Sequence, residues 1–273
     1  MNIYSREQVA SLPKETFAFI EVQDADHVLT ITLDRAEKKN AIHPHMLNEL
    51  AFAMQYAHYQ KHVWAIVLQA KGDVFCAGAD LKAFMGMVGK FDSSIPKPDG
   101  QVLIGEIFNK VHKPTIAKVA GNAYAGGIIL LAACNYVVAL DSVKLGLPEV
   151  KRGLFPFQVM EALLRVMPAR KVVDWCIRGY SISAQQAEGH GLVTHLADST
   201  DALTAQVDSL IAELKDNSPS AIRLGLEAFD HIQSSEQQHK YLSKMLQKTI
   251  MTKDGQEGLR AFRQKRKPVW TGE

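Results

Sequence analysis

Cysteine is scarce in this sequence, and the few cysteines form no recognisable ligand set. The three of them, Cys76, Cys134 and Cys176, lie far apart in a chain of 273 residues, and none belongs to a CxxC pair. A scattered, odd-numbered set of this kind predicts neither a disulfide framework nor a zinc site. We therefore expect reduced thiols, a cytoplasmic location and no bound metal.

An excess of one charge and long apolar runs are missing as well. The formal net charge is +2, no segment reaches the apolar length of a membrane span, and the N-terminus has no apolar stretch behind a basic start. We expect neither a nucleic acid nor a membrane as partner. The one basic cluster, Lys265, Arg266 and Lys267, is either a solvated patch or a contact for a phosphate-bearing ligand.

The sequence also lacks a GxSxG motif and a Walker loop, which argues against a nucleophile-elbow hydrolase and a P-loop nucleotide-binding protein. What it does contain is an ordinary globular composition, with 47% hydrophobic and 22% charged residues. A chain of this length and composition can bury a sizeable core.

The first part of the chain predicts a hairpin followed by a helix. Residues 17–22 and 28–33 alternate or run apolar on either side of the polar segment 23–27, which is typical of two antiparallel strands. Apolar residues then recur at helical spacing over 44–59, with Pro44 where the first turn of a helix tolerates proline.

The order strand, glycine turn, helix then occurs twice, and further helices follow. The predicted segments of the two units are 64–70, 75–80 and a helix from Leu81, then 114–121, 125–127 and 128–133, followed by a strand at 136–140. Residues 88–101 lack periodicity and predict a mobile surface loop that could act as a lid. Predicted helices after Gly153 are 158–166, 168–179, 183–189, 200–216, 218–233, 236–251 and 255–266.

Both glycine turns lead into the start of a helix, where backbone N–H groups have no intrahelical partner. The turns at 76–80 and 125–127 can each donate to an oxygen, and glycine lets a ligand approach the backbone closely. Two converging donors would form an oxyanion hole, which stabilises charge that develops in a transition state. Taken singly, each turn is more simply explained as a tight connection without a ligand.

Glu149 is the strongest candidate for a general base, because it follows Pro148 just after a short predicted strand. A surface glutamate paired with Lys151 or Arg152 explains the residue equally well.

Four other polar or aromatic residues have simpler interpretations. His43 and His45 have no matching ligand set and are predicted to be surface groups at a helix start. Asp80 is predicted to cap the helix that begins at Leu81. Tyr124 could reach a substrate, although a packed aromatic is the simpler interpretation.

Seven ordered segments, distributed over nearly the whole length of the chain, form a recognisable pattern. They are KKNAI (38–42), FCAGADLK (75–82), KPTIAKVAGNAYAGG (113–127), LGLPEVKRG (145–153), SAQQAEGHGLV (183–193), SPSAIRLG (218–225) and DGQEGLRAFRQKRKPVW (254–270). In these segments the chain resembles the crotonase, or enoyl-CoA hydratase/isomerase, superfamily. The resemblance implies an α/β fold, a spiral of ββα units over 1–195, and a helical C-terminal region over 196–273 that serves trimerisation and CoA contact. It also implies homotrimers, often paired into hexamers.

The resemblance assigns roles to both glycine turns. It implies that the N–H groups of Ala79 and Gly126 hold the thioester oxygen of an acyl-CoA and that Glu149 is the acid/base. No cofactor is implied beyond the coenzyme A of the substrate. The positions that the resemblance places at the substrate or its CoA are Lys39, Ala77, Asp80, Leu81, Lys82 and Gly127, together with Phe262 and Lys265, which would reach the CoA of a neighbouring subunit.

Two departures from the family pattern bear on the reaction. Ile129 stands where two-carboxylate hydratases have a glutamate, and 157–160 replaces a glycine-rich stretch. Hydration normally shares its proton transfers between two carboxylates, whereas a single base suits an isomerase that moves a proton between C2 and C4. Gln158 or Tyr124 could help to hold a water. Hydratase is the first interpretation, isomerase the alternative, and a non-catalytic acyl-CoA binding protein a third; the near-neutral charge disfavours RNA binding.

Overall fold

The computed structural model describes residues 3–87, 89–108, 111–233, 243–244, 246–247 and 250–269. Most of the helix expected over 236–251 lies outside the described residues, as do Val88 of the predicted loop and Trp270 of the last matching segment. Within the described part of the chain, no helix combines the length and the apolar character needed to cross a membrane.

Two β-sheets form the frame of the molecule. The larger sheet has the order β1-β2-β3-β5-β7-β10 and the smaller β4-β6-β8-β9. Neighbouring strands are parallel except for the pairs β1–β2 and β8–β9. The strands are β1 (Ile20–Ala25), β2 (Val28–Leu33), β3 (Ala65–Ala70), β4 (Val74–Cys76), β5 (Thr115–Val119), β6 (Asn122–Tyr124), β7 (Tyr136–Leu140), β8 (Lys144–Gly146), β9 (Ser181–Ser183) and β10 (His195–Ala197).

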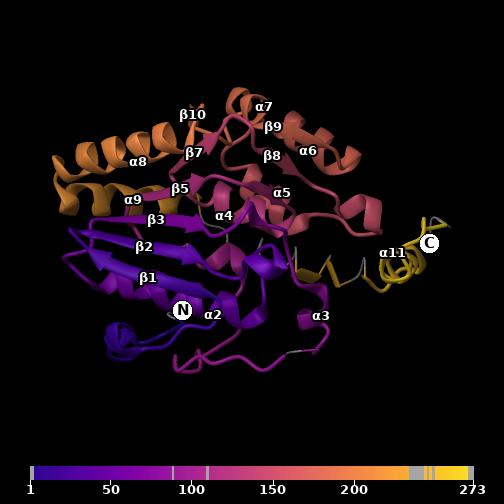
Figure 1. Cartoon of the computed structure of the whole chain (residues 1–273), viewed down its shortest axis with the longest axis horizontal. Helices are drawn as coiled ribbons and strands as arrows, with labels where there is room; N and C mark the ends of the chain where they lie inside the picture. The colour runs from indigo at the N-terminus through magenta and orange to yellow at the C-terminus, as the bar shows by residue number, and fades with distance from the viewer. Residues whose placement is uncertain are drawn as a thin grey trace.

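From β3 onward the chain alternates between the two sheets. Strands β3, β5 and β7 join the larger sheet, the strand after each of them joins the smaller one, and a helical segment follows each pair. These segments are α2 (Pro44–Tyr59) after β1–β2, α3 (Leu81–Phe84), α4 (Gly126–Ala132), and the 3-10 helix η4 (Glu149–Arg152) with α5 (Phe157–Leu163). The predicted α/β fold with its ββα spiral is thereby confirmed (Figure 1).

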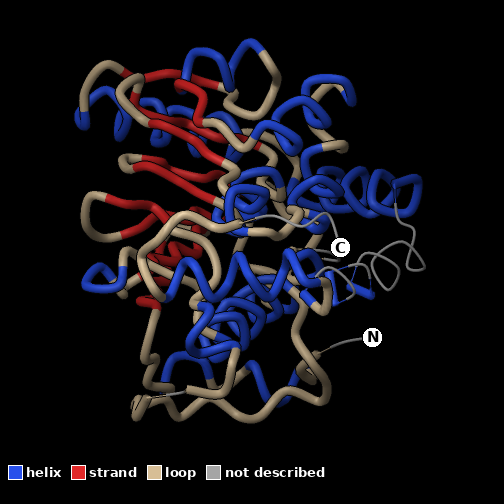
Figure 2. The backbone as a smooth tube through the Cα atoms, turned by 90° about the vertical axis from the view of Figure 1, so that its right-hand side faces the viewer, coloured by secondary structure: helices blue, strands red, loops and turns tan. Residues whose placement is uncertain are grey.

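The remaining helices surround the strands, which gather on one side of the molecule (Figure 2). They are α1 (Arg6–Val9), η1 (Leu12–Lys14), η2 (Ala36–Lys38), η3 (Ile104–Glu106), α6 (Ala169–Arg178), α7 (Ala184–Gly189), α8 (Thr200–Lys215), α9 (Pro219–Gln233) and α11 (Lys253–Arg263). Strand β10 begins at residue 195, the last residue of the expected core domain. The larger sheet therefore extends two residues beyond the expected boundary.

The larger sheet is covered on both faces. Along β3, Ile66 and Leu68 pack into the main core, whereas Val67 packs with Leu203 and Val207 of α8. Side chains alternate across a strand, so a strand that is buried on both faces is apolar at every position. This explains why 64–70 lacks the alternation of a half-exposed strand.

The first hairpin is tighter than predicted. The segment 23–27 was expected to connect the strands, but β1 continues to Ala25, and only Asp26 and His27 form the turn. Both have positive φ, at 49° and 67°. Two-residue turns of this kind match the twist of a hairpin. The prediction was wrong because polar residues of an exposed edge strand resemble those of a loop.

The described residues of the predicted loop, 89–101, have no regular secondary structure, as predicted, but they are fixed by hydrogen bonds and packing. The Ser94 N–H donates to the Thr16 carbonyl over 3.0 Å, and the Asp99 N–H donates to the Ile3 carbonyl over 3.0 Å. The side chain of Ile95 is buried. Contacts with the N-terminal residues therefore hold this segment in place.

Helix α11 packs against η4 through a glycine. A Cβ atom on Gly258 would lie 2.0 Å from the Arg152 carbonyl oxygen, so no larger residue fits without displacement. We expect Gly258→Ala to lower the free energy of unfolding by about 1–3 kcal/mol, as overpacking does in other cores. Thermal unfolding measures this. The control is Gly225→Ala, where a Cβ meets open space; equal melting temperatures for both variants would contradict the packing described.

Candidate active site

Three predicted site residues follow three neighbouring parallel strands of the smaller sheet. Ala79 lies just beyond β4, Gly126 just beyond β6 and Glu149 just beyond β8, and these strands are adjacent in the order β4-β6-β8. The carboxyl ends of parallel strands meet at one edge, where open α/β sheets bind ligands. Because neighbouring strands are about 4.8 Å apart, Gly126 stands in the middle, with Ala79 and Glu149 on either side.

The two glycine turns are in contact with each other. Gly78 has a φ of +91°, and a Cβ there would lie 2.7 Å from the Ala125 Cβ and 3.4 Å from the Gly126 nitrogen. A Cβ on Gly126 would in turn lie 3.8 Å from the Ala79 nitrogen. The amide nitrogens of Ala79 and Gly126 therefore border one small space, and side chains at the two glycines would fill it.

Both of these amides are available to a ligand. On either side of Ala79, the Ile42 N–H donates to the Gly78 carbonyl over 2.8 Å and the Asp80 N–H donates to the Ile42 carbonyl over 2.9 Å. Among the residues that the structure describes, the N–H groups of Ala79 and Gly126 have no partner. Ala79 is exposed and Gly126 half-buried. The pair can therefore donate two hydrogen bonds to one incoming oxygen.

Glu149 is the first residue of η4, and its surroundings are unusual for a carboxyl group. Its Oε2 atom is sealed from solvent and has no hydrogen-bond partner among the described residues. Burial raises the pKa of Glu149 to about 7, although a backbone hydrogen bond and the charge of Arg152 lower it in part. The expected surface alternative, an ion pair with Lys151 or Arg152, is absent from the described structure. A carboxyl with this pKa can both take and give a proton at neutral pH.

The pKa of Glu149 predicts how the stability of the fold depends on pH. Because burial raises this pKa from 4.5 to about 7, the native state keeps a proton that the unfolded chain loses between these values. Stability therefore falls as the pH rises through this window. Glutamine carries no charge, so the melting temperature of Glu149→Gln should rise relative to that of the parent between about pH 5 and pH 8. A difference that stays constant with pH would contradict the burial of this carboxyl.

Arg35, a residue that the sequence interpretation missed, anchors the turn that carries Ala79. Its guanidinium pairs with the Asp80 carboxylate over 2.8 Å and donates to the Ala41 carbonyl over 2.8 Å. The Asp80 carboxylate also accepts the Ala83 N–H over 3.2 Å, so its predicted role as the cap of α3 is confirmed. The one sequence signal that could have identified Arg35 is its position three residues before the KKNAI segment.

The predicted CoA positions of the first turn lie together. The Ala77 N–H donates to the Lys39 carbonyl over 3.0 Å, which brings residues far apart in the sequence side by side. Leu81 is half-buried, and the side chains of Lys39 and Lys82 are exposed. Two cationic side chains thus lie near the amide pair.

Gly127, also predicted to contact the ligand, is buried at the start of α4. A Cβ on Gly127 would lie 2.8 Å from the Cys76 Cβ, so its missing side chain lets α4 pack against β4.

The two predicted positions near the C-terminus lie on α11 and just beyond it. The half-exposed ring of Phe262 lies 4.7 Å from the Arg152 guanidinium of the same chain, and Lys265 is exposed. Within the basic cluster, Arg266 forms a two-point ion pair with Glu257, at 2.5 and 2.9 Å.

His43 was predicted to be a surface group, and this was wrong. It is buried and caps α2, because its Nδ1 accepts the His45 N–H over 3.1 Å. Its ring packs on Phe19 with the centroids 4.6 Å apart, and burial lowers its pKa. The hydrogen bond that caps α2 holds the imidazole of His43 in the interior.

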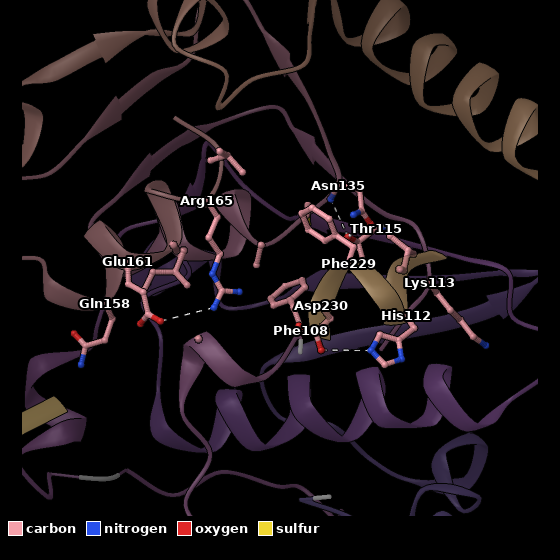
Figure 3. A pocket seen from close by; sticks show the side chains of 18 residues that line it. Phe108, His112, Lys113, Thr115, Asn135, Gln158, Glu161, Arg165, Phe229 and Asp230 are labelled. Atoms are coloured by element: carbon pink, nitrogen blue, oxygen red, sulfur yellow. Dashed lines mark hydrogen bonds and ion pairs between the residues drawn. The ribbon is translucent and has the colours of Figure 1, made fainter. Parts of the chain in front are cut away.

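A cavity of about 290 Å³ opens between α4, α5 and α9 (Figure 3). Both departures from the family pattern contribute to its lining, the first through Ile129 and the stretch 157–160 through Gln158. Ile129 is buried and makes its wall apolar at the position of the missing carboxylate. Several charged side chains also line this α4–α5–α9 cavity, and the sequence patterns had not brought them together.

Comparisons with known proteins extend the resemblance to nearly the whole chain. Residues 23–273 match the family model for enoyl-CoA hydratase/isomerase. A probable enoyl-CoA hydratase of Bacillus subtilis is 32% identical, over 86% of this chain and 92% of that protein. The mevalonyl-coenzyme A hydratase of Aspergillus fumigatus is 30% identical, over 89% and 91%. The crystal structure of carnitinyl-CoA hydratase from Mycobacterium avium superimposes with a TM-score of 0.81 at 26% identity, over 94% of this chain and 100% of that one. This chain is therefore an enzyme of the enoyl-CoA hydratase/isomerase family.

Proposed function

We propose that the protein binds an acyl-CoA thioester, holds its carbonyl oxygen between the N–H groups of Ala79 and Gly126, and moves a proton with Glu149. The observation that supports this most strongly is the arrangement of the three residues at the ends of three adjacent strands. The two amides border one space, and neither has a partner among the described residues.

Such a donor pair acts on the charge that develops during the reaction. When a proton leaves C2 or a nucleophile adds to C3, negative charge moves onto the thioester oxygen, and fixed N–H donors stabilise it there. These hydrogen bonds are stronger in the transition state than in the bound substrate, so they raise the rate. Burial keeps the pKa of Glu149 at about 7, which suits a group that must accept a proton and return it.

Hydration of a 2-enoyl-CoA is the first candidate reaction, since several relatives are named as hydratases. In this reaction Glu149 takes a proton from the water that adds to C3 and returns a proton to C2. Gln158, which lines the adjacent cavity, is a candidate to hold the water.

Isomerisation of a 3-enoyl-CoA to a 2-enoyl-CoA is the second candidate, and Ile129 favours it. This buried apolar side chain stands where two-carboxylate hydratases have a second glutamate. With one carboxylate left, a proton can be carried from C2 to C4 on the same group, without an ordered water.

The surroundings of the site suggest how the rest of the substrate is bound. We propose that Lys39 and Lys82 contact the phosphates of CoA, and that Phe262 and Lys265 contribute to a CoA site across a homotrimer or hexamer. The enzyme would need no further cofactor, metal or nucleic acid and would act in the cytoplasm. Light scattering of the purified chain tests the assembly; a monomer would contradict a site shared between subunits.

Turnover of crotonyl-CoA and of a 3-enoyl-CoA, with identification of the products, tests the proposed function. A 3-hydroxyacyl-CoA formed from crotonyl-CoA indicates hydration, and a 2-enoyl-CoA formed from the 3-enoyl-CoA indicates isomerisation. Binding of both compounds without turnover of either would instead support a non-catalytic acyl-CoA binding protein.

A further inference from the structure

The α4–α5–α9 cavity lies along helix α4, whose first residue, Gly126, carries one amide of the pair. Ile129 lines the cavity and lies one helical turn, about 5 Å, beyond Gly126 on α4. The lining continues past the end of this helix to Asn135. An acyl group whose carbonyl oxygen meets the Gly126 N–H therefore has space for its tail along α4. At about 290 Å³ the cavity has the volume of about ten water molecules.

Apolar side chains such as Ile129 form one part of the cavity lining, and charged side chains form another. The guanidinium of Arg165, two residues beyond the end of α5, lies 3.7 Å from the carboxylate of Glu161 in that helix. The imidazole of His112 is hydrogen-bonded to Asp230 of α9 over 3.4 Å. In Figure 3 the ring of Phe108 falls between these two pairs, and the ring of Phe229 is drawn above them, near Asn135. Glu161 is almost fully buried, and the side chains of Arg165 and Asp230 are 29% and 24% exposed. Donors and acceptors thus face a space otherwise suited to hydrocarbon.

The formal charges of the lining cancel. Arg165 and Lys113 are cationic, and Glu161 and Asp230 are anionic. The ammonium group of Lys113 donates hydrogen bonds to the carbonyl oxygens of residues 60 and 63 and so satisfies these two backbone acceptors. An ionised acyl tail would be attracted by the lining side chains of one charge and repelled by those of the other. The cavity therefore offers hydrogen bonds without a net attraction for ions.

We propose that this cavity selects acyl groups whose far end carries a neutral hydrogen-bonding group, a hydroxyl above all. The proposal rests on the proposed function, because it assumes that the acyl carbonyl is held by the amide pair. A hydroxyl both donates and accepts, so it can bond to a carboxylate and to a guanidinium in one site. A methyl end displaces water from the same charged groups and gives no hydrogen bond in return, which costs binding free energy.

Calorimetric binding of matched acyl-CoA compounds tests the selection directly. Octanoyl-CoA and 7-hydroxyheptanoyl-CoA have tails of equal length, and the shorter homologues of each form further pairs. At one or more of these lengths, the hydroxylated compound should bind about tenfold more tightly or better. Tighter binding of the methyl-ended compound at every length, or equal binding throughout, would overturn the proposal.

Substitutions of residues that line the cavity test whether the selection takes place there. Arg165→Met and, as a second and milder change, Asp230→Asn should each reduce the preference for the hydroxyl at least severalfold. The matched control is Arg178→Met, which breaks an exposed ion pair with Asp174 at the same spacing on α6 and should leave the preference as in the parent. An unchanged preference in both cavity variants would place the hydroxyl elsewhere and overturn the proposal.

Binding and turnover separate this inference from the proposed function. Saturated compounds bind without being converted to another product, so their binding is measured apart from turnover. A hydroxyl preference in a protein that turns over no enoyl-CoA would contradict the proposed reaction and leave the selection standing. Turnover of crotonyl-CoA without a hydroxyl preference would overturn the proposed selection and leave the proposed function standing. If none of the compounds bound to the protein, both the proposed function and the proposed selection would be contradicted.

Discussion

Replacement of Glu149 by glutamine should lower kcat/KM for the enoyl-CoA substrate by about 10²–10⁴-fold, the range typical of a lost general acid–base. Glutamine keeps the size and hydrogen-bonding shape of the side chain but can neither take nor give the proton. The carboxyl of Glu149 is buried, and its pKa is about 7, so the parent enzyme has a group that titrates in the working range. Initial rates with crotonyl-CoA and a 3-enoyl-CoA measure the loss.

Two controls belong to this experiment. Glu188→Gln removes an exposed carboxylate from α7 and should leave the rate unchanged. Glu149→Gln itself should bind a saturated acyl-CoA with an affinity close to that of the parent, because the amide pair remains. A rate equal to that of the parent in Glu149→Gln would remove this residue from the mechanism.

Replacement of Gly126 by alanine should lower kcat by about 10²–10³-fold, the effect seen when one oxyanion-hole donor is lost. The added methyl group would lie 3.8 Å from the Ala79 nitrogen and 3.3 Å from the Ile42 Cδ1 atom. These contacts are tight but tolerable, so the variant should fold. The methyl group, however, stands between the two donors, in the space that the thioester oxygen must occupy.

The matched control for Gly126→Ala is Gly225→Ala, where the new methyl group meets open space on α9. Steady-state kinetics of both variants, with thermal unfolding to verify that each is folded, separate a blocked oxygen site from a damaged fold. Full activity in Gly126→Ala would show that the oxygen of the substrate lies elsewhere.

The parts of the fold that have strong local signals were predictable from the sequence. The apolar spacing of α2, the buried run of β3 and the periodic C-terminal helices each carry a pattern of their own. Strand β6 does not, because its three residues are too few to show a period, and it follows Gly121 directly. The turn at Asp26 and His27 escaped because its conformation depends on the pairing of the two strands.

The site was predictable only in part, for a related reason. Its backbone donors come from short turns that glycine marks in the sequence. The burial that raises the pKa of Glu149 is a property of the packed protein, however, and no local pattern encodes it. The hydrogen bond between His112 and Asp230 joins residues 118 positions apart, and the first of them lies in an irregular segment. Contacts of this kind become visible only when the chain is folded.

Exchange of the C2 hydrogens of butyryl-CoA in D₂O, followed by NMR, tests the central claim most directly. It requires neither water addition nor a double bond, and so depends only on whether the enzyme can form and reprotonate an enolate. We predict that the parent protein exchanges deuterium into C2 and that Glu149→Gln and Gly126→Ala each slow this exchange by about 10²-fold or more. Exchange at the parental rate in both variants, or no exchange by a parent protein that binds butyryl-CoA, would contradict the account.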